Sequence, residues 1–177
     1  MNVEWITLPR RKQTRLQAYD YAQEGSYFIS ICAAERRCLF GDISEGEMRL
    51  NSVGEIAAVC WYQIPRHFPG IELGEYVIMP NHMHGILTTA VRMDKTGNPP
   101  NSNPSISTIV GRFKGAVTKQ VRAIQGHEHM RVWQRGFYEH VIRTERALAR
   151  MRQYICDNPV KWDLDEDNLE RRTRGRR

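Results

Sequence analysis

The stretch from Ile71 to Ala90 reads IELGEYVIMPNHMHGILTTA and contains two predicted β-strands that meet at a break at Pro80-Asn81. Successive side chains of a strand point to opposite faces of the sheet, so His82 and His84 project together while Met83 turns into the core. This geometry presents two imidazoles to one metal ion. Histidine pairs also occur by chance, so the rest of the chain has to support the interpretation.

Outside this stretch, predicted strands and helices alternate without the regular βαβ repeat of a doubly wound fold. The spacing of Ser52 and Glu55 fits a capping box, and Pro65 is expected to end the helix that Ser52 begins. We therefore predict an α+β fold, with helices packed on a mostly antiparallel sheet. Beyond 71–90, the predicted extended runs are 27–33, 38–41, 48–50, 132–135 and 137–142, and the predicted helices cover 52–65, 107–124 and 144–159.

The composition favours a polyanionic partner such as nucleic acid, because the net charge is +6 and the sequence pI is about 9.4. The four cysteines have no CxxC spacing, which argues against a structural zinc site and a disulfide framework. No apolar run approaches the ~20 residues of a membrane span, and the amino terminus does not resemble a signal peptide. A cytoplasmic protein is expected.

The 177 residues suit one domain with tails better than two domains. We predict a basic amino-terminal arm over 1–24, the domain over 25–162 and a charged tail over 163–177. The tail begins acidic and ends in clustered arginines, which fits either a disordered polyampholyte or a DNA-binding arm.

A second informative pair lies in the last predicted helix, where Tyr154 and Asn158 are spaced i, i+4 and share one side. Beside a metal-bound phosphate, a tyrosine hydroxyl can attack and form a covalent intermediate. Asn158 could complete a site of two histidines and one oxygen. Such a site suits Mg²⁺ or Mn²⁺, although imidazoles also admit Zn²⁺, Co²⁺ or Ni²⁺.

Three blocks of the chain resemble the successive signature motifs of the REP-associated tyrosine transposases, which belong to the single-tyrosine HUH transposases. In the HUH motif, U is an apolar residue, here Met83. The likeness extends from about Tyr27 to Trp162. The blocks are Met79-Pro80-Asn81-His82-Met83-His84-Gly85-Ile86, Trp133-Gln134-Arg135-Gly136-Phe137-Tyr138-Glu139-His140-Val141-Ile142-Arg143 and Tyr154-Ile155-Cys156-Asp157-Asn158-Pro159-Val160-Lys161.

The resemblance implies a ferredoxin-like domain in which His82 and His84 ligate a divalent ion, Mg²⁺ or Mn²⁺, with Asn158 as third ligand. Tyr154 would attack a scissile phosphate and leave a 5′-phosphotyrosine link and a free 3′-hydroxyl. The implied substrate is single-stranded DNA at palindromic repeats folded as hairpins. A monomer is expected.

Basic and aromatic residues of the same region are candidates for DNA contacts. Trp133, Phe137 or Tyr138 could stack on unpaired bases, although a place in the core is favoured for each. The predicted phosphate contacts are Arg112, Lys114, Arg135, Arg143 and Lys161.

The sequence leaves several alternatives open for the site residues and for the function. Tyr138 is a weaker candidate nucleophile than Tyr154, because its block is predicted to be extended and lacks the i+4 partner. The pair His127 and His129 lies in a polar turn and is interpreted as an accidental copy of the spacing. His140 could lie behind the metal ligands, replace one, or contact phosphate. A DNA hairpin-binding protein without cleavage, or a nickase of the relaxase or replication-initiator type, are the alternative functions.

Overall fold

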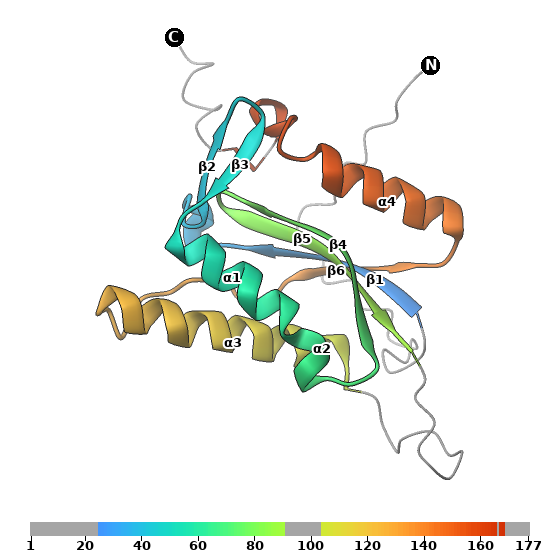
Figure 1. The fold of residues 1–177 in the computed structure, drawn as a ribbon, viewed down its shortest axis with the longest axis horizontal. Helices are drawn as coiled ribbons and strands as arrows, with labels where there is room; N and C mark the ends of the chain where they lie inside the picture. The colour runs from blue at the N-terminus through green and yellow to red at the C-terminus, as the bar shows by residue number, and fades with distance from the viewer. Residues whose placement is uncertain (1–24, 91–103, 166, 169–177) are drawn as a thin grey trace.

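The computed structural model describes residues 25–90, 104–165 and 167–168 (Figure 1). Its strands are β1 (Gly25–Cys32), β2 (Gly41–Ser44), β3 (Glu47–Leu50), β4 (Ile71–Met79), β5 (His82–Thr89) and β6 (Tyr138–Ile142). Its α-helices are α1 (Ser52–Tyr62), α2 (Ile64–His67), α3 (Ile106–Gln125) and α4 (Glu145–Asp157). Short 3-10 helices cover Ala34–Arg36 and Trp162–Leu164.

The main sheet has the strand order β4-β5-β1-β6, and every neighbouring pair is antiparallel. β1 and β4 therefore run parallel, with β5 inserted between them, and β6 closes the other edge of β1. This is the split βαβ arrangement of a ferredoxin-like fold. β2 and β3 form a separate hairpin. The predicted α+β fold with a mostly antiparallel sheet is confirmed.

The two faces of the sheet carry different layers, with α1 and α3 on one face and α4 on the other (Figure 1). The larger core lies under α1 and α3, where Ile29, Met83 and Leu87 belong to one buried cluster with residues of both helices. The smaller core lies under α4 and contains Phe28, Ile86, Ile142, Met151 and Ile155.

Close packing on the α1 face depends on Gly85, the residue after the second histidine. A Cβ atom built at Gly85 would lie 2.4 Å from the buried ring of Trp61 on α1. Because no real contact is that short, glycine allows the ring to lie against the strand.

Two predicted boundaries of the first helix were wrong. Asn51, not Ser52, is the N-cap, since its side-chain oxygen accepts hydrogen bonds from the backbone N–H groups of Val53 and Gly54. α1 ends at Tyr62, and Pro65 lies in the first turn of α2, where a missing N–H costs little.

The predicted extended runs at 38–41 and 132–135 also differ from the structure. β2 begins at Gly41, after an irregular segment. In the second run, Trp133 makes an isolated bridge to Ala33 rather than a strand. Its indole is buried against Phe40 and Phe113, which confirms the core position.

The packed part of the chain extends past the predicted boundary at residue 162. Asp167 forms an ion pair with Arg36, and Asn168 is buried and donates a hydrogen bond to the carbonyl of Trp162. The predicted arm over 1–24 and the arginine-rich end of the tail lie outside the described residues. Within the described ranges, no helix has the length and apolar character needed to span a bilayer.

Candidate active site

The two histidines lie side by side on the sheet face that α4 covers. His82 and His84 pair with Cys32 and Ser30 of β1, and their ring centroids are 4.6 Å apart. Both side chains are almost fully buried. Met83 points into the opposite core, as the strand alternation predicts.

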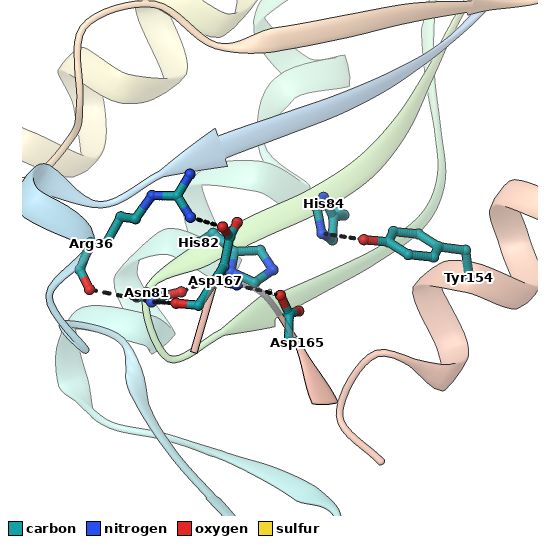
Figure 2. A network of polar contacts seen from close by, with 7 residues as sticks. All are labelled: Arg36, Asn81, His82, His84, Tyr154, Asp165 and Asp167. Carbon is teal, nitrogen blue, oxygen red and sulfur yellow. Dashed lines mark hydrogen bonds and ion pairs between the residues drawn. The ribbon is translucent and has the colours of Figure 1, made fainter. Parts of the chain in front are cut away.

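Helix α4 brings Tyr154 to this pair. Its apolar stripe, with Met151 and Ile155, packs on the sheet, and Thr144 caps its start through the N–H of Ala147. The Tyr154 hydroxyl lies 3.4 Å from Nε2 of His84, so the two halves of the predicted site meet in space (Figure 2). Phe28 supports both rings, stacked on His84 and edge-on to Tyr154.

Asn158 completes the group from the end of α4. Its Nδ2 lies 3.4 Å from the Tyr154 carbonyl oxygen, to which it donates, and its Oδ1 is buried without a hydrogen-bond partner. Because the amide nitrogen of Asn158 points to the backbone of α4, its amide oxygen points away from the helix.

Burial sets the charge of both histidines. It lowers the pKa of His82 to about 4, against a smaller raising effect of the Asp165 carboxylate. It also lowers the pKa of His84 well below the ordinary value, and the neighbouring His82 adds to this effect. Both imidazoles are therefore neutral near pH 7, the form that binds metal ions.

Burial also raises the pKa of the Tyr154 hydroxyl, an effect that Asn158 opposes and the charge of Asp165 reinforces. Without a further charge nearby, the Tyr154 hydroxyl therefore keeps its proton and is a weak nucleophile. A positive charge beside it would be needed to favour the phenolate.

The buried polar atoms of the site fit a divalent cation. Nε2 of His82, Nδ1 of His84 and Oδ1 of Asn158 all lack a hydrogen-bond partner. Such atoms are rare in proteins because each costs desolvation free energy, and a bound cation would offset that cost. The described residues contain no group of three His, Cys, Asp or Glu side chains that could hold a metal, so an amide such as Asn158 would have to contribute.

Two neighbours of the site had no predicted role. Asn81 is buried and its Oδ1 lies 2.8 Å from Nδ1 of His82. Asp165 belongs to the acidic stretch after α4, and Figure 2 shows its carboxylate close to His82. The position of Asn81 next to His82 in the sequence could have indicated a contact between them. The position of Asp165 depends on how the chain turns after α4, which the sequence does not show.

The predicted phosphate contacts do not gather around the histidines. Arg112 lies over the ring of Phe68, Arg135 and Arg143 are exposed, and Lys161 forms an ion pair with Asp157. Lys114 is half-buried and donates to the carbonyl oxygens of Gln134 and Gly136, at 2.7 and 2.8 Å. Its ammonium group thus holds the segment before β6 in place, and a phosphate would have to compete with these bonds.

A basic groove of about 1210 Å³ lies between α3 and the segment that follows it, on the side of the sheet opposite α4. Glu128 is the one acidic residue among the described residues that line it. Its basic lining residues are Lys114, Lys119, Arg122, Arg131 and Arg135, and this set is called the basic groove below.

The open alternatives can now be placed. His140 is exposed on β6, opposite Phe28 in register, and therefore on the same sheet face as His84. Tyr138 lies in a strand and packs into the smaller core. His127 and His129 are exposed in the turn after α3, as predicted.

Comparisons with known proteins agree with the sequence motifs. An uncharacterized protein of Haemophilus influenzae strain Rd is 39% identical over 167 residues, which cover 88% of this chain and 92% of that protein. A protein of the same organism named "Putative REP-associated tyrosine transposase" is 27% identical over 146 residues, covering 80% and 74% of the two chains. No protein-family model matches the chain.

One of two similar solved structures shows the same fold. A REP-associated tyrosine transposase bound to a REP hairpin superposes with a TM-score of 0.52 at 21% identity, covering 81% of this chain and 72% of that one. A putative transposase from Deinococcus radiodurans R1 gives a TM-score of 0.47 at 19% identity, covering 83% and 97%. The chain belongs to the same family as the 39% identical Haemophilus protein, and it resembles the REP-associated tyrosine transposases in sequence and in fold.

Proposed function

We propose that the protein is a metal-dependent transposase that cleaves and rejoins single-stranded DNA at palindromic repeat hairpins. The observation that carries the proposal is the 3.4 Å approach of the Tyr154 hydroxyl to His84, inside a buried group that also contains His82 and Asn158. A binding protein without chemistry has no need for a tyrosine beside two neutral imidazoles. The names of the related proteins support the same class of activity.

In the proposed reaction the Tyr154 oxygen attacks the phosphorus atom of the scissile phosphodiester. The bond from phosphorus to the 3′-oxygen breaks, the tyrosine proton is lost, and the 3′-oxygen takes up a proton to become a hydroxyl. The DNA stays attached through a 5′-phosphotyrosine. Because a phosphodiester is exchanged for another, the reverse attack by a 3′-hydroxyl rejoins a strand without ATP.

His82, His84 and Asn158 would hold the cation, either Mg²⁺ or Mn²⁺. A bound divalent cation would polarise the phosphate and offset the charge that builds on it. The protein contributes a dry, rigid setting, since Phe28 stacks on His84 and fixes the direction from which Tyr154 approaches.

Binding of the DNA backbone is assigned to the exposed basic residues. The basic groove fits a polyanion, and Arg135 and Lys119 are exposed within it. A DNA segment in the groove and another at Tyr154 would lie on opposite sides of the sheet, so a hairpin with an adjoining single strand suits both better than a short single strand does.

The test uses a labelled single-stranded oligonucleotide that contains a hairpin, with Mn²⁺, in cleavage assays and denaturing gels. We expect wild type to cleave and to form a covalent protein–DNA adduct, and Tyr154→Phe to do neither while still binding the hairpin. Tyr138→Phe is the matched control, because it removes a half-buried tyrosine hydroxyl from the same sheet face.

Three results would contradict the proposal in different ways. Adduct formation by Tyr154→Phe would show that another residue is the nucleophile. Hairpin binding without cleavage in wild type, with any divalent ion, would indicate a binding protein. Cleavage of strands without a hairpin would favour a nickase of the relaxase or replication-initiator type.

A further inference from the structure

Asn81 occupies the turn between β4 and β5 and is 1% exposed. The backbone of this turn is held firmly, since the Asn81 carbonyl accepts from the N–H of Ala33 and the Pro80 carbonyl accepts from the N–H of Phe40. The side chain of Asn81 therefore starts from a fixed point beside His82, the first residue of β5.

The orientation of the Asn81 amide follows from its partners. Nδ2 lies 3.2 Å from the carbonyl oxygen of Arg36 and 2.6 Å from the carbonyl oxygen of Asp167 (Figure 2). Carbonyl oxygens only accept hydrogen bonds, so the group that faces them must be the NH₂. The amide oxygen is thereby turned to Nδ1 of His82, at 2.8 Å.

This orientation determines where the proton of His82 lies. The Asn81 oxygen can only accept, so Nδ1 must carry the hydrogen. In a neutral imidazole the other nitrogen, Nε2, then has the lone pair. Nε2 is buried and has no hydrogen-bond partner among the described residues, so it is available to a cation.

We propose that Asn81 is a positioning residue that fixes His82 in the Nδ1–H tautomer and directs the lone pair of Nε2 to a divalent cation. The inference rests on the proposed function in one respect, that a cation binds beside His82. Ligand histidines in proteins commonly donate their second N–H to an oxygen acceptor, which fixes the ring and raises its basicity.

An amide suits this position better than a carboxylate. A carboxylate at residue 81 would still accept from Nδ1 but would place a negative charge against the carbonyl oxygens of Arg36 and Asp167, and near Asp165. Two donors and one acceptor are needed, and asparagine supplies them on a side chain of the right length. The ion pair between Arg36 and Asp167 holds the two carbonyl-bearing segments together.

The test compares Asn81→Ala with Asn51→Ala. Asn51 is the matched control, because its side chain also makes three hydrogen bonds, to Val53, Gly54 and Leu39, but lies at the start of α1. The first readout is the tautomer of His82 in the metal-free protein, from long-range ¹⁵N–¹H NMR spectra near pH 7. The second is the affinity for Mn²⁺ by titration calorimetry.

We expect His82 of wild type and of Asn51→Ala to be in the Nδ1–H form. In Asn81→Ala a mixture of tautomers is expected, with an affinity for Mn²⁺ that falls about 10- to 100-fold, as for other lost partners of ligand histidines. Asn81→Asp keeps an acceptor for Nδ1, so it should keep the tautomer even where stability falls. Asn81→Asp therefore distinguishes the loss of the acceptor for Nδ1 from a loss of packing in the turn.

The inference is overturned if wild-type His82 is found in the Nε2–H form, or if Asn81→Ala leaves both the tautomer and the affinity unchanged. It is also overturned if wild type binds no Mn²⁺. Failure of the proposed function looks different: Mn²⁺ binds, and the tautomer responds to Asn81, but no DNA is cleaved.

Discussion

The two faces of the central sheet differ in the chemistry of the side chains that they bury. Under α1 and α3, strands β1 and β5 contribute Tyr27, Ile29, Met83 and Leu87, which pack into one large apolar core. On the α4 face the same strands contribute polar residues beside a smaller core. These polar residues are Ser30, His82 and His84.

Unpaired polar atoms occur on both faces, but their chemistry differs. On the α1 face they include the indole nitrogens of Trp61 and Trp133, which can only donate and cannot ligate a cation. Near α4 they are imidazole nitrogens of His82 and His84 and the amide oxygen of Asn158, and each of these atoms can ligate a cation. The α1 face therefore stabilises the fold, whereas the α4 face carries buried polar groups whose desolvation cost a bound cation would offset.

The largest loss of stability is expected from Trp61→Ala. The ring is fully buried between Gly85, Tyr76 and Phe113, and a large cavity would remain in the α1 face. Large-to-small changes of this kind cost about 3–5 kcal/mol. Urea unfolding measures the loss, and a cost below about 1 kcal/mol would contradict the assignment of this face as the stabilising one.

The α4 face should be the more sensitive to acid. His82 has a pKa of about 4 in the folded protein against 6.5 ordinarily, so below pH 6.5 the unfolded chain binds a proton that the folded protein does not. The free energy of unfolding should therefore fall as pH decreases from about 6.5 to 4, by roughly 3 kcal/mol at most from this group.

Urea unfolding at several pH values checks this, with His82→Gln as the control. The variant lacks the titrating ring, so its stability should fall less steeply over the same interval. Parallel curves for the two proteins would show that His82 is accessible to protons in the folded state.

A smaller and more selective effect is expected from Phe28→Leu, compared with Tyr27→Leu at the adjacent residue. Phe28 stacks on His84 and contacts Tyr154 edge-on, whereas Tyr27 faces the other core. Losing the aromatic contacts at Phe28 should cost about 1 kcal/mol. Only Phe28→Leu should also slow formation of the protein–DNA adduct, because Tyr154 loses its support. Equal rates in both variants would mean that the contact does not orient the tyrosine.

The smallest effect is expected from Arg152→Ala. Its ion pair with Glu75 joins α4 to β4 at 2.9 Å, but both side chains are well exposed. Such pairs contribute about 0–1 kcal/mol and weaken with salt. Thermal unfolding at low and high salt would test this, and a larger, salt-independent loss would show that the pair, rather than the buried stripe, holds α4 on the sheet.

The sequence predicted those parts of the site that follow from local periodicity. Alternation along β5 placed His82 and His84 on one face, and the i, i+4 spacing placed Asn158 beside Tyr154. The meeting of α4 with β5 was implied only by the family resemblance, because neither element specifies its partner. The roles of the site residues stay predictions until they are measured.

The remaining features depend on contacts between distant segments. Lys114 was predicted to bind phosphate from its charge, but its amine reaches two carbonyl oxygens that no local pattern reveals. Asp165 belongs to a stretch interpreted as a charged tail, and its approach to His82 requires the chain to turn back after α4. Asn51 was missed as the N-cap because Ser52 and Glu55 have the capping-box spacing, whereas Asn51 is followed by Gly54 three residues later.

The hydrogen bonds of Asn81 have a consequence for the order of events during synthesis. They join Asn81 to Arg36, 45 positions earlier in the chain, and to Asp167, 86 positions later. The amide can therefore make both hydrogen bonds only after Asp167 has been made and has returned to the sheet. Helices α1 and α3 end well before that point in the chain, at Tyr62 and Gln125. The hydrogen bonds that orient Asn81 would thus be completed later in the synthesis of the chain than the helices that cover the larger core.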